Sequence, residues 1–392
     1  MKNLKHDKLA LVSLAVGAFG IGTSEFSSMG VLPLFSVDLS INISDATQAI
    51  TAYAIGVVVG APLLTLAAAR INRRSLLLVL MLVLAVGNII SSAAYSLETL
   101  SIGRFISGLP QGVFFGAGAV VATHIVGQAR AGKAFAIVVS GMTLATIIGA
   151  PMGTLVGQYF GWRTAYSGFA IYNILALGCM FVWLPKTPAL DGNPVSRELT
   201  AFLKWKIWAM MIIASLCVAS TFSVYTFIGP YITDLANLSP TFIPVGLAVF
   251  GLGMAVGNPL GGILADRYEF KGMLLGFAFT LLMLATMALY GQIPLILMLT
   301  LFFVGATLMI AVPTIPVRMM HMAPEAPTLM GAMNMAAFNV ANALGASIGG
   351  ATINAGLGLI SAIWAGFALT SIGLLFFTVV FGVRRTPVNQ LT

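Results

Sequence analysis

The stretch LALVSLAVGAFGIGTSEFSSMGVLPLFS, residues 9–36, contains a single charged side chain. A helix needs about 20 apolar residues to cross a bilayer, so this stretch is long enough to span one. Because the apolar run is continuous rather than alternating, it predicts a helix and not a strand of a membrane barrel. It is too long for the apolar region of a signal peptide and has no A-x-A cleavage site, so we expect it to remain as a membrane-spanning helix.

Eleven further apolar runs follow, and charged or turn-forming residues separate them. With 59% of its residues apolar and 8% charged, the chain differs from soluble globular proteins, in which about a quarter of the residues are charged. We therefore expect an all-α membrane protein with twelve transmembrane helices. The predicted spans are 9–36, 46–69, 75–95, 99–123, 132–160, 164–184, 207–232, 242–265, 272–291, 293–317, 328–355 and 359–383.

The longest polar stretch, KTPALDGNPVSREL at 186–199, separates the sixth run from the seventh. It divides the chain into an N-terminal six-helix bundle at 1–184, a cytoplasmic central loop at 185–206 and a C-terminal six-helix bundle at 207–392. The halves also repeat, because a constant shift of 197 positions superposes punctuating residues of one half on like residues of the other. Parallel repeats with a site between them near the midplane are typical of one large class of secondary transporters. The superposed pairs are Pro33 with Pro230, Gly56 with Gly253, Gly60 with Gly257, Pro62 with Pro259, Arg70 with Arg267, and Arg74 with Lys271.

The 19 Lys and Arg residues are unevenly distributed across the predicted membrane. Arg163 alone falls on the side opposite the N-terminus, Arg104 lies within a span, and the other seventeen fall on the N-terminal side. Positive residues collect in cytoplasmic loops. We therefore expect both termini in the cytoplasm and the chain in the inner membrane of a bacterium. The net charge of +8 then reflects topology, and we expect no nucleic-acid partner.

The sequence does not indicate a metal or cofactor site. Cys179 and Cys217 lie in apolar runs without a CxxC pattern, and the histidines His6, His124 and His321 are far apart. No Gly-Lys-Ser/Thr phosphate-binding loop occurs, so uphill transport must use an ion gradient. We expect no cofactor, no enzymatic activity, and a monomer whose partners are the lipid bilayer, protons and a small-molecule substrate.

Glu25 is the only acidic residue inside a predicted span. At 1.5 Å per residue it lies about 12 Å from the Pro33 end of its helix, and Arg104 lies about 10 Å from the Leu97 end of the fourth span. The only two charges within the spans therefore lie at similar depth. Charged residues in spans are costly and mark ion or substrate pathways, so we predict that Glu25 and Arg104 couple transport to protons. A static structural ion pair is the alternative interpretation.

The second half contains the stretch GILADR at 262–267. It resembles the signature between the second and third spans of the major facilitator superfamily, and the resemblance extends over essentially the whole chain. The resemblance implies that Gly262 allows close helix approach, and that Asp266 and Arg267 pair with each other or with helix ends at a cytoplasmic gate. Charge that only sets topology is the alternative. The first-half copy lacks the Gly and the Asp and retains its arginines, among them Arg70 and Arg74.

The fifth span contains GAPMG at 149–153, with Gly149, Pro151 and Gly153. Small residues at this spacing let helices pack backbone to backbone, and proline fixes a bend. The stretch resembles the antiporter signature of the same superfamily. We predict a close contact that seals one side of the cavity, with generic small-residue packing as the alternative.

Three further stretches resemble the drug:proton antiporter branch of this superfamily, which includes arabinose-type and chloramphenicol-type efflux permeases. They are GTSEFSSMGVLP at 22–33, RFISGLPQG at 104–112 and AFNVANALG at 337–345. The resemblance implies the major facilitator fold, with two bundles around a central cavity. Hydrogen bonding between helices explains each polar residue in the spans equally well. The substrate-cavity candidates are Gln111, Tyr225, Asn258, Asn334, Asn339 and Asn342.

The expected function is export of a small organic solute, such as a drug, a sugar or a purine-like metabolite, in exchange for protons. The alternative is a proton-independent or proton-symport carrier of sugars or nucleosides, which would share this fold. Such a carrier could use Glu25 only to bind its substrate.

Overall fold

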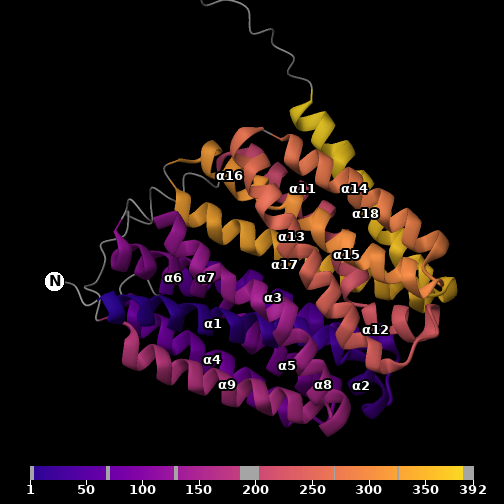
Figure 1. Ribbon diagram of the computed structural model, residues 1–392, viewed down its shortest axis with the longest axis horizontal. Helices are drawn as coiled ribbons and strands as arrows, with labels where there is room; N and C mark the ends of the chain where they lie inside the picture. The colour runs from indigo at the N-terminus through magenta and orange to yellow at the C-terminus, as the bar shows by residue number, and fades with distance from the viewer. Residues whose placement is uncertain are drawn as a thin grey trace, which may run out of the picture.

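The computed structural model describes residues 4–67, 71–127, 131–185, 203–268, 270–324 and 326–382. Within these ranges every regular element is helical, and the long helices lie side by side (Figure 1). By length and composition, 11 helices are able to cross a membrane. The remaining predicted span folds as α17 (Pro327–Thr352), a helix of 26 residues that includes three asparagines. The predicted all-α membrane architecture is confirmed.

In the first half, several predicted spans are built from more than one element. The first span breaks at Val31, immediately before the Leu32–Pro33 start of a short second helix. The fifth span contains a π-helical turn that apolar periodicity did not predict. The elements are α1 (Leu4–Gly30), α2 (Leu32–Asp38), α3 (Ile43–Ala67), α4 (Arg73–Ser92), α5 (Leu97–Gly108), α6 (Gln111–Val126), α7 (Ala131–Leu144), η2 (Ala145–Gly149), α8 (Ala150–Phe160) and α9 (Trp162–Trp183).

The second half has the same plan, and its breaks again lie beside prolines and glycines. The elements before α17 are α11 (Trp205–Tyr225), α12 (Ile228–Pro230), η4 (Tyr231–Leu235), η5 (Pro240–Phe242), α13 (Ile243–Arg267), α14 (Lys271–Tyr290), α15 (Pro294–Ala311) and α16 (Thr314–Met322). After α17 come η6 (Ile353–Leu357) and α18 (Ile360–Phe381).

The internal repeat is present in the packing as well as in the sequence. Gly56 on α3 lies so close to α5 that an added Cβ would collide with the carbonyl oxygen of Phe105. Gly253 on α13 lies in the same way against the carbonyl oxygen of Phe302 on α15. Both members of the second pair lie 197 positions after those of the first, so the two halves use glycine for the same helix–helix contact.

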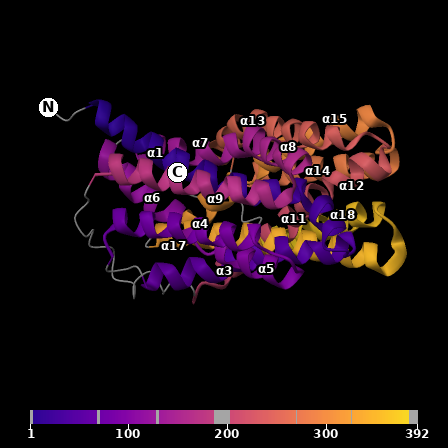
Figure 2. The same ribbon diagram turned by 90° about the horizontal axis from the view of Figure 1, so that it is seen from below.

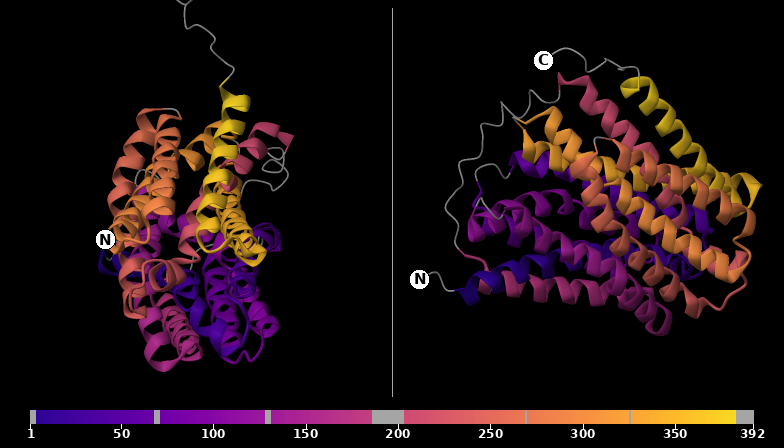
Figure 3. Two further views of the ribbon diagram at one scale, coloured as in Figure 1. Left: turned by 90° about the vertical axis from the view of Figure 1, so that its right-hand side faces the viewer. Right: turned by 45° about the horizontal axis from the view of Figure 1, so that its top comes forward.

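The two halves lie against each other along a broad seam. Figures 1 and 3 show the indigo-to-magenta helices on one side and the orange-to-yellow helices on the other. Figure 2 shows α17 beside α3, and α13 beside α8. Side chains also hydrogen-bond across the seam, with Thr51 Oγ1 lying 3.0 Å from Ser347 Oγ and Gln158 Nε2 donating to the Pro240 carbonyl at 2.7 Å. The domain boundaries at 184/185 and 206/207 remain a prediction, because residues 186–202 lie outside the described ranges.

Candidate functional site

Glu25 lies where the two halves meet, near the C-terminal end of α1. Its side chain is buried, with 1% of its surface exposed. One carboxylate oxygen accepts a hydrogen bond of 2.9 Å from Gln111 Nε2 on α6. The other accepts a longer one, 3.5 Å, from Asn342 Nδ2 on α17. A single carboxyl group therefore contacts both halves of the molecule.

Arg104 on α5 is also buried, but it does not form an ion pair with Glu25. Among the described residues, the one salt bridge within 4.0 Å joins Arg163 to Asp38. The Arg104 guanidinium instead lies 4.4 Å from the ring centre of Tyr53 and 5.5 Å from that of Tyr166. These cation–π contacts favour a charged guanidinium in a buried position.

Ser24, the neighbour of Glu25 in the chain, connects Arg104 to the rest of the first half. Arg104 Nη1 donates to Ser24 Oγ at 3.2 Å, and Ser24 Oγ donates to Asn88 Oδ1 on α4 at 2.8 Å. Tyr166 on α9 donates to Ser28 Oγ at 2.9 Å, one turn further along α1. The positive charge is thus fixed beside Glu25 through residues that surround it, and the static ion pair is not formed.

Five polar atoms around Glu25 are buried without a hydrogen-bond partner. Gln111 and Asn342 each use their amide nitrogen on the Glu25 carboxylate and leave their amide oxygen unpaired. The hydroxyls of Tyr53 and Tyr225, both within electrostatic range of Glu25, are also unpaired, as is Arg104 Nε. A buried polar group without a partner is destabilising, so this cluster is suited to receive water or a polar ligand.

Aromatic rings form the wall of the site on the side of the second half. Tyr225 lies 5.7 Å from Phe26 and 4.6 Å from Phe250, measured between ring centres. Phe222 and Phe338 lie 5.1 Å apart. The cavity between these rings is only about 10 Å³, which is roughly the space that one water needs. The space between these rings is therefore too small for an organic solute in this structure.

The other predicted cavity residues lie outside this cluster. Asn339 is buried, but its amide donates to the Met335 carbonyl one turn earlier on α17. Asn334 is half-buried on the same helix, and Asn258 is exposed on α13. Of the six cavity candidates, the structure thus brings Gln111, Asn342 and Tyr225 to Glu25.

The small residues of the fifth span pack against α1, on the turns that carry the site. A Cβ at Gly149 would collide with the Thr23 side chain, and one at Gly153 would collide with Ser27. Pro151 is buried at the start of α8, directly after the π-helical turn. The predicted close contact is present, and its partner is the helix that carries Glu25.

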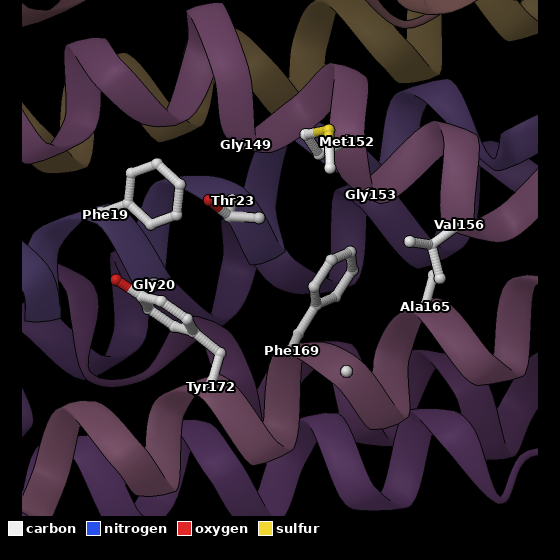
Figure 4. Close-up of a pocket in the computed structure, with 11 residues that line it drawn as sticks. Phe19, Gly20, Thr23, Gly149, Met152, Gly153, Val156, Ala165, Phe169 and Tyr172 are labelled. Atoms are coloured by element: carbon white, nitrogen blue, oxygen red, sulfur yellow. The ribbon is translucent and has the colours of Figure 1, made fainter.

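A separate pocket lies beside this contact and was not predicted from the sequence. Its volume is about 200 Å³, and it lies between α1, α8 and α9 (Figure 4). Figure 4 shows Phe19, Met152, Phe169 and Tyr172 around it. Glu25 does not line this pocket, so the proton-binding candidate and the open space are distinct features.

The predicted gate residues take different positions from those expected. In the part of the chain that the structure describes, no atom of another helix lies within 4 Å of a Cβ built at Gly262, so the prediction that Gly262 permits close helix approach is wrong. Its neighbour Gly261 has that role, because a Cβ there would collide with the Met309 carbonyl oxygen. Asp266 and Arg267 are exposed, and no ion pair joins them in the described part of the chain.

Two basic residues complete the list of predicted site residues. Arg74 donates to the Phe181 carbonyl oxygen near the end of α9, with its guanidinium 5.3 Å from the Phe181 ring centre. Arg70 lies outside the described residues. Sequence reasoning assigned no role to Tyr53, Asn88 and Tyr166. Each is a polar residue within an apolar run, but their convergence on Arg104 and on its partner Ser24 depends on the tertiary fold.

Comparison with known proteins gives the family. The model of the Major Facilitator Superfamily matches residues 14–336 and 210–391. The chain is 38% identical over 370 residues to the inner membrane transport protein YdhP of Escherichia coli (strain K12), covering 92% of this chain and 94% of that protein. It is 32% identical over 372 residues to a chloramphenicol resistance protein of Streptomyces lividans, covering 94% and 95%.

A solved structure supports the same fold. A bacterial homolog of the human lysosomal transporter Spinster, in an inward-facing and unoccupied conformation, aligns with a TM-score of 0.73 and 13% identity over 97% of both chains. Proteins of the superfamily whose model matches this chain are membrane transporters and not enzymes. The chain belongs to the Major Facilitator Superfamily.

Proposed function

We propose that this transporter exports a small organic solute from the cytoplasm in exchange for protons, and that Glu25 carries the proton. The observation that carries the proposal is the position of Glu25, a buried carboxyl group that accepts hydrogen bonds from Gln111 of one half and Asn342 of the other. Because the Glu25 carboxyl group is hydrogen-bonded to both halves, a change in its charge can change how the halves are positioned relative to each other.

The physical basis is the free energy of a charge inside the membrane. A carboxylate within the hydrocarbon region is disfavoured by several kcal/mol, and binding a proton removes that charge. Protonation from outside then favours reorientation of the halves, and a solute that enters from the cytoplasm promotes release of the proton inside. Similarity to a chloramphenicol resistance protein supports an organic solute and the outward direction.

The proposal includes a location and a topology. The chain lies in the inner membrane of a bacterium as a monomer, with both termini in the cytoplasm. Similarity to an inner membrane transport protein and the uneven distribution of Lys and Arg support this placement.

The test begins with a resistance screen in an efflux-deleted host, which identifies an exported compound. Uptake of that compound is then measured in inside-out vesicles with an acidic lumen. We expect Glu25→Gln to abolish concentration of the compound, because the amide keeps the shape but cannot titrate. Glu25→Asp should retain part of the activity, because it keeps the carboxyl group and shortens only its reach.

The vesicles also distinguish antiport from the competing mechanisms. Exchange of one proton for a neutral solute moves a net charge, worth about 2.3 kcal/mol per 100 mV, so uptake should respond to membrane potential. If Glu25→Gln concentrates the compound at the wild-type rate, Glu25 is not the coupling residue. If the wild type equilibrates the compound without responding to the pH gradient, the chain is a uniporter.

A further inference from the structure

The hydrogen-bond network around Glu25 has a defined polarity. A carboxylate accepts hydrogen bonds and cannot donate them, whereas a side-chain amide has an NH₂ donor and a C=O acceptor. An amide beside a carboxylate must therefore turn its NH₂ toward it. Gln111 does so at 2.9 Å, and its carbonyl oxygen, on the opposite edge of the amide group, is left buried and unpaired.

This orientation favours the ionised form of Glu25, because each carboxyl oxygen faces an NH₂ donor and neither amide offers an acceptor for a proton. Once the carboxyl oxygen nearest Gln111 binds a proton, its new O–H faces the Gln111 NH₂, so a donor faces a donor. The torsion that rotates an amide is broad and roughly two-fold, which makes a half-turn accessible without a change of rotamer at the other side-chain bonds. After that turn the previously unpaired carbonyl oxygen accepts the O–H.

We propose that Gln111 is a proton-responsive amide switch: it presents its carbonyl oxygen to the site when Glu25 is ionised and its NH₂ group when Glu25 is protonated. Asn342 has the same polarity, with its amide nitrogen 3.5 Å from the other carboxylate oxygen and its amide oxygen unpaired. The longer distance makes Gln111 the principal partner of the proton.

The switch defines a class of ligand, and this step rests on the proposed export function. With Glu25 ionised, two amide oxygens are available to accept hydrogen bonds, and Tyr225, within electrostatic range of Glu25, belongs to the wall of aromatic rings. This surface is complementary to a neutral solute with N–H or O–H donors on an apolar or aromatic frame. Protonation of Glu25 makes Gln111 present a donor to the site in place of an acceptor. This change weakens the binding of such a solute. The proton and the solute would then compete through the amide without touching each other.

The charged and titratable groups around Glu25 are few in the described part of the chain. They are Arg104 on α5, Tyr53 on α3 and Tyr225 on α11. Arg104 contributes a fixed positive charge. The two tyrosine hydroxyls are unpaired, so they are the alternatives to Gln111 as hydrogen-bond acceptors for a protonated Glu25.

The experiment is infrared difference spectroscopy between high and low pH on the full chain in lipid bilayers. Glutamine is labelled with ¹³C at its side-chain carbonyl, and the chain has only six glutamines, so the background is small. In the wild type we expect a protonated-carboxyl band to appear together with a shift of one labelled amide band to lower frequency, since that carbonyl gains a hydrogen bond.

Variants assign the two bands. Glu25→Leu should lose both changes, and Gln111→Met should keep the carboxyl band and lose the amide shift. Gln292→Met is the matched control, because Gln292 is exposed in the connection between α14 and α15, within one half and away from Glu25. It should give the wild-type spectrum.

Three outcomes contradict the switch. A carboxyl band that appears without an amide shift in the labelled wild type would overturn it and leave Glu25 as the proton carrier, with a tyrosine as acceptor if tyrosine bands change instead. An amide shift that persists in Gln111→Met would also overturn it. Absence of the carboxyl band would mean that Glu25 does not titrate, which overturns the proposed function together with the switch.

Discussion

Ser24 holds two buried side chains in place with one hydroxyl group. It accepts from Arg104 and donates to Asn88, so Ser24→Ala leaves both partners with one hydrogen bond fewer. We expect the variant to lose about 1–2 kcal/mol of stability. Thermal unfolding in detergent, followed by tryptophan fluorescence, measures the loss. Ser13→Ala is the control: Ser13 is equally buried but donates to the Ala10 carbonyl of its own helix, so its loss of stability should be smaller than that of Ser24→Ala.

Asp38 forms an ion pair with Arg163 at the end of the molecule opposite the N-terminus. Hydrogen bonds from Arg163, at 2.6 Å, and from Trp162, at 3.1 Å, hold the pKa of Asp38 below its ordinary value. Because the pKa is lower in the folded state, the pair stabilises the protein above the unfolded-state pKa of about 3.9, and this contribution disappears as the pH falls through the folded-state value.

Asp38→Asn should therefore lower the stability of the protein at neutral pH and leave it unchanged in acid. Both side chains are partly exposed, so we expect a loss of no more than about 1 kcal/mol at pH 7. The difference between variant and wild type should shrink toward zero as the pH is lowered below about 4. Unfolding midpoints measured across this range test the sign, and a difference that grows in acid would contradict the assignment.

The π-helical turn η2 and the glycines after it form one structural unit with α1. A π-turn inserts one residue into the helical repeat and often marks a functional site. Here it sets the register at which Gly149 faces Thr23 and Gly153 faces Ser27, the turns on either side of Glu25. The contact of α8 with α1 therefore supports the helix that positions the carboxyl group.

Even alanine at these glycines should disturb transport, since an added methyl group would overlap the side chains of α1. We expect Gly149→Ala and Gly153→Ala each to reduce the transport rate at unchanged expression. Gly168→Ala and Gly178→Ala on α9 are matched controls, because no atom lies within 4 Å of their added Cβ. Equal transport rates in all four variants would show that Gly149 and Gly153 serve only ordinary helix packing.

Element positions could be predicted from the sequence, but breaks within them could not. Continuous runs of about 20 apolar residues predict a helix because the other structure that satisfies the backbone in lipid, the closed barrel, shows an alternating pattern. The π-turn at Ala145–Gly149 leaves the apolar pattern unchanged, so periodicity does not detect it. The same limit explains the error at Gly262, since a glycine run in a helix does not say which member faces the neighbouring helix, and Gly261 does.

At the scale of the whole molecule, the internal repeat could be predicted from the sequence, whereas the site around Glu25 could be predicted only in part. The constant spacing of Gly56 and Gly253 predicted equivalent helices, which their matching contacts confirm. Glu25 was identifiable because a lone carboxyl in a span is costly. Its hydrogen bond to Gln111, 86 positions away, depends on packing within the N-terminal half, and its hydrogen bond to Asn342, 317 positions away, depends on how the halves meet.

Transport by this fold requires the halves to move relative to each other, and the seam offers a direct test. Thr51 on α3 and Ser347 on α17 face each other across it, with their hydroxyl oxygens 3.0 Å apart. Cysteines at both positions, in a chain lacking Cys179 and Cys217, should form a disulfide on oxidation, because sulfur atoms bond at about 2.05 Å. The bridge would hold the halves in this arrangement, so transport should stop and return on reduction.

The control for this cross-link lies within one half. Thr280 on α14 and Thr307 on α15 are 2.9 Å apart between hydroxyl oxygens, and both belong to the second half. A disulfide there leaves the seam free, so transport should continue at a rate close to that of the reduced form. If the Thr51–Ser347 bridge forms and transport persists, α3 and α17 stay together during the cycle and the moving surface must lie elsewhere along the seam. Loss of transport in both cross-linked proteins would instead show that rigidity within a half is enough to block the cycle.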